Sequence, residues 1–224
     1  MATLPRRLET DQSPPAVPTR RAPRGPARTQ PPTGPYRFTI KQYERMTRHG
    51  ILDEHDPVVL IDGALVRKIP RNEPHVAATR RALRALQHLD LAGWLVCKED
   101  PIVLPKGREG RESVPEPDLS VLRGDIEDYD RRKPGPADVG LIVEVADTSV
   151  RKDRGMLLRY AHANVPTTWL IDLNTRVVEV HTDPTGPAKR PRYRKVARFA
   201  DNETVPVVLD GLEVGRVAVR DLLP

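Results

Sequence analysis

Two short apolar segments, each interrupted by one acidic residue, constrain this chain more than any other feature. One reads Pro-Glu-Pro-Asp-Leu-Ser-Val-Leu (115–122), and the other reads Gly-Leu-Ile-Val-Glu-Val-Ala (140–146). Both are aliphatic and of strand length. A buried ionised carboxylate is costly unless it is paired or binds a cation. If the strands are neighbours, Asp118 at the start of the first and Glu144 inside the second converge on one point, which suits a hard divalent cation such as Mg²⁺.

A structural explanation competes with this metal site. A lone acid at the end of a strand commonly caps a turn or pairs with an arginine, and this chain contains many arginines. For either acid taken alone, the structural explanation is the stronger one. The presence of both acids on consecutive apolar strands brings the two explanations to about equal weight.

The composition indicates one folded domain preceded by a tail. A chain of 224 residues suits one domain of average or slightly large size. Residues 1–35 carry nine of the 24 prolines and six arginines against two acids, so they hold +4 of the formal charge of +6. We expect this basic tail to be disordered, and the folded domain to span residues 36–224. The tail either adds salt-sensitive affinity for nucleic acid or is a solvated extension without a role.

The cysteine count and the hydropathy bear on the compartment. Cys97 is the single cysteine, which excludes an internal disulfide and a Cys-based zinc motif and fits a reducing environment. No apolar run approaches the ~20 residues that a membrane span needs. Residues 1–30 also lack the apolar segment of a signal peptide. We therefore expect a cytoplasmic protein with no membrane partner.

The remaining patterns predict an α/β fold with a mixed sheet. Apolar residues at helical spacing predict helices over residues 40–50, from residue 73 onward, and over about 150–163. The Asp62-Gly63 pair between two apolar runs predicts a β-hairpin. Further strands are expected at residues 94–104, 167–173, 177–181, 205–209 and 212–219. A long loop over residues 123–138 is expected at the rim of the site.

Several short motifs follow one another along residues 36–224. They are Arg37-Phe38-Thr39, Leu60-Ile61-Asp62-Gly63, Pro74-His75, Pro115-Glu116-Pro117-Asp118, Glu144-Val145-Ala146-Asp147-Thr148-Ser149, Asp153-Arg154-Gly155, Tyr160-Ala161, Val165-Pro166 and Trp169-Leu170-Ile171-Asp172. No single motif is specific, but the ordered set resembles the Uma2 family of restriction-endonuclease-like domains within the PD-(D/E)XK nuclease superfamily. The resemblance implies a restriction-endonuclease-like core, in which helices flank a central mixed β-sheet.

The same resemblance implies the composition of the site. Asp118 and Glu144 would be the catalytic metal ligands, and the backbone carbonyl of Val145 would be a third ligand. The cofactor would be Mg²⁺, with Mn²⁺ as an alternative, and the partner would be DNA. A metal held in this way lowers the pKa of a bound water and stabilises the charge that develops during phosphodiester hydrolysis.

Three further residues are candidate accessory groups. His75 stands where the family often has a His, and it would contact the substrate phosphate or shuttle a proton. A His at the start of a helix more commonly makes only local contacts. Lys152 is near the site in sequence, but at the start of a helix we expect it to face solvent. Asp153 would cap or brace the helix that follows it.

The chain departs from the family pattern where the water-activating groups should be. Members usually carry a Glu before the Leu-Ile-Asp-Gly stretch, and this chain has Val59 there. Members also carry a lysine in the helix between the Asp-Arg-Gly turn and the Tyr-Ala pair. Here Leu157 is the nearest match, and Arg159 is a poor substitute for a base because it is not deprotonated. Ala146 occupies the place of the superfamily's original lysine.

Three hypotheses follow. The protein is a metal-dependent endonuclease, a catalytically weakened nuclease fold that binds nucleic acid or a protein partner, or an α/β scaffold whose two acids form structural ion pairs. By analogy with restriction nucleases, an active enzyme would be a homodimer. Carboxylates of Asp118 and Glu144 within about 5 Å of each other and open to solvent would support a metal site, whereas an arginine between them would support the scaffold.

Overall fold

The structure is a computed structural model that describes residues 34–224, apart from residues 54, 106, 108–109 and 148–149. The side chains of residues 150–153 are also outside the description. The predicted tail over residues 1–35 lies almost wholly outside the described residues, so its disorder stays a prediction. Within the described part of the chain, no helix is both long enough and apolar enough to cross a membrane.

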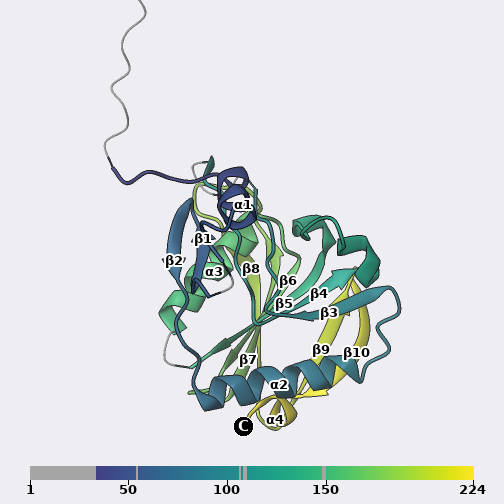
Figure 1. Ribbon diagram of the computed structural model, residues 1–224. Coiled ribbons are helices and arrows are strands. Elements are labelled where there is room, and N and C mark those ends of the chain that lie inside the picture. The colour runs from purple at the N-terminus through teal and green to yellow at the C-terminus, as the bar shows by residue number, and fades with distance from the viewer. Residues whose placement is uncertain (1–33, 54, 106, 108–109, 148–149) are drawn as a thin grey trace, which may run out of the picture. The chain divides into compact units, whose positions relative to one another are not determined.

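A six-stranded mixed sheet forms the centre of the fold (Figure 1). Neighbouring strands are antiparallel except β5 and β6, which are parallel and joined by the helix α3 (Val150–His162). The expected α/β class with a central mixed sheet is therefore confirmed. The strands in spatial order are β3 (Trp94–Lys98), β4 (Leu119–Arg123), β5 (Val139–Ala146), β6 (Thr167–Asp172), β7 (Val177–Pro184) and β8 (Tyr193–Ala200).

The two faces of the sheet are covered by different elements (Figure 1). One face packs against α2 (Glu73–Gln87), α4 (Val219–Leu222) and the ribbon of β9 (Thr204–Leu209) and β10 (Leu212–Ala218). The other face packs against α3. Successive side chains of β5 point alternately into these two cores, so both faces of the strand are buried. This explains why β5 is apolar throughout except at Glu144.

A hairpin and a short helix stand beside the sheet. The helix α1 (Ile40–Arg48) begins at a capping box formed by Thr39 and Gln42. The antiparallel strands β1 (Val58–Ile61) and β2 (Ala64–Arg67) confirm the expected hairpin. Its turn places Asp62 at φ 48° and Gly63 at φ 74°, and a Cβ atom at Gly63 would lie 2.9 Å from the Cβ of Arg37. Only glycine fits this turn without strain or displacement of its neighbour.

The structure corrects several expected boundaries. The strand expected over residues 94–104 ends at Lys98, because Glu99 adopts φ 60° and Pro101 follows shortly after. The first acid-bearing strand begins at Leu119, so Asp118 directly precedes β4 and does not lie within it. β8 was not expected, because most of its residues are exposed and it lacks a buried apolar face. Residues 123–138 contain the short 3-10 helices η2 (Ile126–Tyr129) and η3 (Pro136–Asp138).

Candidate functional site

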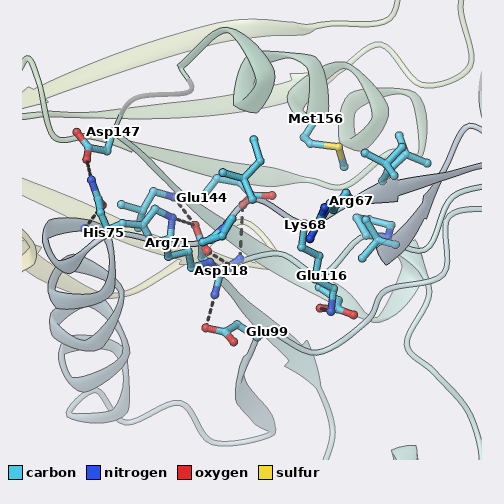
Figure 2. Close-up of a pocket in the computed structure, with 18 of the residues that line it drawn as sticks. Arg67, Lys68, Arg71, His75, Glu99, Glu116, Asp118, Glu144, Asp147 and Met156 are labelled. Atoms are coloured by element: carbon cyan, nitrogen blue, oxygen red, sulfur yellow. Dashed lines mark hydrogen bonds and ion pairs between the residues drawn. The ribbon is translucent and has the colours of Figure 1, made fainter. Parts of the chain in front are cut away.

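Asp118 and Glu144 come together at one end of the sheet (Figure 2). β4 and β5 are neighbours, with Leu119 opposite Val143, so the residue before β4 meets the end of β5. The backbone nitrogen of Asp118 lies 3.5 Å from Oε2 of Glu144. The backbone N–H of Val145 donates a hydrogen bond of 2.7 Å to Oδ2 of Asp118. The two acid-bearing segments are therefore neighbours in the sheet, as the metal-site hypothesis requires.

A cavity of about 480 Å³ opens beside this acid pair. Its walls come from the β1–β2 hairpin, the linker between β2 and α2, the start of α2, the strand ends around the acids, and α3. Charges of both signs line it, as Figure 2 shows: Arg67, Lys68, Arg71, His75, Glu99, Glu116, Asp118, Glu144 and Asp147. Residues 123–138 are not among its lining residues, because that segment follows the far end of β4. Their expected place at the rim was therefore wrong.

Asp118 is only 3 % exposed, and its two oxygens have different partners. Oδ1 lies 2.7 Å from Nη2 of Arg71. Oδ2 accepts the Val145 hydrogen bond and lies 3.2 Å from Nε2 of His75. Arg71 also pairs with Glu99, so the guanidinium joins Asp118 to Glu99. An arginine contact of the kind that the scaffold hypothesis requires is thus present at Asp118, where Arg71 bridges to Glu99.

Glu144 is positioned by α3. The hydroxyl of Tyr160 donates a hydrogen bond of 2.7 Å to Oε1 of Glu144. Burial, and after it the neighbouring Glu144 carboxylate, raise the pKa of the Tyr160 phenol well above its ordinary value. The phenol therefore keeps its proton at neutral pH and remains a donor to Glu144.

The start of α2 delivers His75 to the site. Asn72 caps the helix by accepting a hydrogen bond of 3.2 Å from the backbone N–H of His75, and its own amide donates to the carboxylate of Asp147. The imidazole then reaches Asp118, so His75 is not limited to the local contacts that a helix-start His commonly makes. Lys152 and Asp153 lie in α3, but their side chains are outside the described residues, and their roles stay predictions.

The donors around the acid pair fit a hard cation that takes few protein ligands. The Glu144 carboxylate reaches the backbone nitrogen of Asp118, and the Asp118 carboxylate reaches that of Val145, whose backbone carbonyl is the implied third ligand. Among the residues that the structure describes, no group of three His, Cys, Asp or Glu side chains could hold a metal ion. Mg²⁺ suits such a set, because it commonly binds one or two carboxylates and keeps several waters. A cation that binds Oδ1 of Asp118 would compete there with Arg71.

Met156 is an α3 residue on the wall of the same cavity as the acid pair. Met156 and Tyr160 are four residues apart on α3, so they share one helix face, and both line the cavity. Leu157, the nearest match to the family lysine, is buried in the core beneath the helix and does not line the cavity. Val59, like Met156, lines the cavity. The cavity walls at which the resemblance implies a Glu and a lysine therefore carry the apolar residues Val59 and Met156.

Sequence reasoning missed Arg71, Glu99 and Lys68. Lys68 pairs with Glu116 at 2.6 Å on the cavity wall. Glu99 follows the edge strand β3, and its backbone N–H donates to the carbonyl of Asp118 at 3.3 Å. An acid directly after an apolar strand could have been predicted to lie near Asp118, provided that β3 was also predicted to pair with β4. Arg71 lies in a linker, where no periodicity marks the direction of a side chain.

Comparisons with known proteins agree with this architecture. Residues 40–220 match the Uma2 family, which is described as "Putative restriction endonuclease". A similar solved structure is the crystal structure of a "putative nuclease belonging to DUF820" from Anabaena variabilis ATCC 29413. The two chains are 18 % identical with a TM-score of 0.57, and the match covers 83 % of this chain and 97 % of that one. At this identity the similarity shows the fold alone. No curated protein matches the chain.

Proposed function

The chain belongs to the Uma2 family, and we propose that it is a metal-dependent nuclease that hydrolyses DNA phosphodiester bonds slowly. One observation carries the proposal. Asp118 and Glu144 arrive from adjacent strands at the wall of a charged cavity, with the backbone nitrogen of Asp118 3.5 Å from Oε2 of Glu144. An acid pair beside an open cavity provides oxygen ligands for a divalent cation and space for a phosphodiester.

The roles of the residues follow from their contacts. Asp118, Glu144 and the carbonyl of Val145 would hold Mg²⁺ or Mn²⁺, which would supply Lewis-acid catalysis and a more acidic water. Tyr160 orients Glu144 through its hydrogen bond. The positive charges of Arg67 and of Lys68, which is paired with Glu116, would attract the phosphodiester to the cavity. A homodimer and a cytoplasmic location are further expectations from the sequence that we retain as proposals.

Slow cleavage is expected because Met156 lies on the cavity wall at which the resemblance implies a lysine. A positioned proton-transfer group typically contributes ~10²–10⁴-fold to the rate. Lys68 is the one lysine among the described residues that line the cavity, and it is engaged by Glu116. The lack of an unengaged lysine among the described residues of the cavity wall also favours a second candidate function, a nuclease fold that binds DNA and metal but does not cut.

Plasmid nicking with Mg²⁺ or Mn²⁺ tests the proposal. We expect weak nicking by the wild type, none by Asp118→Asn, and an increase of ~10²-fold or more in Met156→Lys. The matched control is Leu158→Lys, which adds the same charge at an exposed position of α3 that does not line this cavity.

The outcomes separate the two candidate functions. Equal nicking by the wild type and Asp118→Asn would refute the proposed site. DNA binding and Asp118-dependent metal binding without nicking, in both the wild type and Met156→Lys, would support the binding function instead. An equal gain in Leu158→Lys would show that added positive charge, and not a lysine on the cavity wall, accelerates the reaction.

A further inference from the structure

Arg71 holds one particular oxygen of the acid pair. Among the described contacts, the partners of Oδ2 of Asp118 are the backbone N–H of Val145 and the imidazole of His75. The other oxygen, Oδ1, lies 2.7 Å from Arg71. Arg71 lies in the linker between β2 and α2 and lines the cavity, and its side chain is 29 % exposed. It can therefore be reached by a ligand in the cavity without unfolding of a helix or strand.

The guanidinium and a bound cation compete for Asp118. A divalent cation on Oδ1 would meet the positive charge of Arg71 at the same atom, in a buried place where like charges repel strongly. The metal and the present position of Arg71 therefore weaken each other's binding to Asp118. Whatever draws Arg71 away from Asp118 favours binding of the metal.

A phosphodiester has the chemistry to draw Arg71 away. The guanidinium offers a planar pair of donors that matches two phosphate oxygens, and it is less strongly hydrated than an ammonium group. The second partner of Arg71 would not be left without a cation. Lys98 Nζ already lies 3.2 Å from Oε1 of Glu99, the oxygen that Arg71 also contacts.

We propose that Arg71 is a phosphate ligand of this cavity that neutralises Asp118 until a phosphodiester arrives. The inference rests on the proposed function, because it needs the acid pair to bind metal and the cavity to bind DNA. Its consequence is that DNA and metal bind cooperatively: DNA takes Arg71 and frees Oδ1, and the metal then binds the freed carboxylate. By linkage, metal must raise the affinity for DNA by the same factor.

Calorimetric titration of Mn²⁺ tests this coupling, with and without a short double-stranded DNA oligonucleotide. For the wild type we expect DNA to tighten Mn²⁺ binding by about tenfold, within the usual range of couplings between sites. In Arg71→Gln, Mn²⁺ should bind more tightly without DNA, and DNA should add little. The matched control is Arg67→Gln, which removes the same charge from the cavity lining. Among the described contacts, Arg67 has none with Asp118, so this variant should lose DNA affinity but keep the coupling.

Thermal unfolding gives a second readout that does not depend on cleavage. Arg71→Gln leaves Asp118 without its guanidinium, so the variant should melt below the wild type and be stabilised more by Mn²⁺. Equal Mn²⁺ affinities of the wild type and Arg71→Gln, or undiminished coupling in that variant, would overturn this inference while leaving the nuclease proposal intact. Absence of Asp118-dependent Mn²⁺ binding to the wild type, with or without DNA, would overturn both.

Discussion

Two buried carboxylates in this protein have nearly the same neighbours. Asp118 is 3 % exposed, with an arginine at 2.7 Å and a histidine at 3.2 Å. Glu179, on β7, is 6 % exposed, with Arg198 at 2.8 Å and His181 at 3.1 Å. A second arginine, Arg154 of α3, lies 3.5 Å from Glu179. By burial and ion pairing alone, either acid would qualify as a functional residue or as a structural one.

The two clusters differ in what lies beside the acid. Asp118 has a second carboxylate next to it and lines the cavity, whereas Glu179 does not line that cavity and is flanked by arginines. Glu144 and Glu179 are also related by the sheet, since both are paired with Leu170 of the strand between them. Perturbed surroundings therefore do not distinguish the candidate site from a structural cluster. The adjacent second acid and the open cavity do.

The largest expected effect concerns the strand between the clusters. Trp169 on β6 is fully buried in the core on the side of α2. Trp169→Ala should lower the free energy of unfolding by ~3–5 kcal/mol, as for other large buried aromatic residues. Urea denaturation measures this change, and Trp94→Ala, at a half-buried position on the edge strand β3, should cost less. Normal stability with loss of nuclease activity would instead make Trp169 a residue of the site.

The next effect separates the two acids directly. A hundredfold excess of Mn²⁺ over its dissociation constant should stabilise the wild type by ~2.7 kcal/mol. Asp118→Asn should abolish this stabilisation, and Glu179→Gln should retain it, because Glu179 has two arginine partners and no adjacent acid in the described contacts. Thermal and urea unfolding with and without Mn²⁺ give the comparison. Equal stabilisation of the wild type and Asp118→Asn would leave only the scaffold explanation.

Without metal, the two substitutions should behave alike. Each removes a charged hydrogen-bond acceptor from an arginine, so each should lower the free energy of unfolding by ~1–3 kcal/mol. If both carboxylates of the site were unpaired, they would repel each other. Asp118→Asn would then increase the free energy of unfolding by relieving this repulsion. A more stable metal-free Asp118→Asn would therefore show that Arg71 does not hold Asp118 in solution.

The fold could be predicted where burial determines sequence. β5 reads as an apolar run because both its faces are covered, and the β1–β2 hairpin is marked by an Asp-Gly pair, which suits the positive φ angles of its turn. β8 was missed because it is an edge strand, on which the only buried residue is Tyr193. An edge strand needs no alternation of apolar residues, so its sequence does not differ from that of a loop.

The site was predictable only in part, because burial determines the sequence around some of its residues and not around others. Asp118 and Glu144 stood out because acids interrupt segments that otherwise belong in a core. Arg71 and Glu99 lie outside regular elements, and their meeting depends on how the linker before α2 passes the end of β3. Leu157, the nearest match to the family lysine, lies in the core, whereas Met156 lines the cavity, because one residue turns a helical side chain by about 100°.

The smallest expected effect is a pH dependence that belongs to the Glu179 cluster. His181 is 9 % exposed, and this burial is the main cause that lowers the pKa of its imidazole. Glu179 opposes the shift, while Arg154 and Arg198 add to it. The folded protein therefore holds a neutral His181 at a pH where an exposed histidine, with a pKa of about 6.5, begins to take up a proton.

The sign of the stability change follows from proton uptake. Above about pH 6.5 the imidazole is neutral in both the folded and the unfolded chain, and its contribution to stability is fully present. As the pH falls below that value, the unfolded chain binds the proton first, so the free energy of unfolding decreases until the pH passes the lower pKa of the folded state. Urea denaturation of the wild type, His181→Asn and His181→Phe across this window measures the effect. Both variants should lose less stability than the wild type on acidification, whereas profiles parallel to that of the wild type would show that His181 is protonated as readily in the fold as in the unfolded chain.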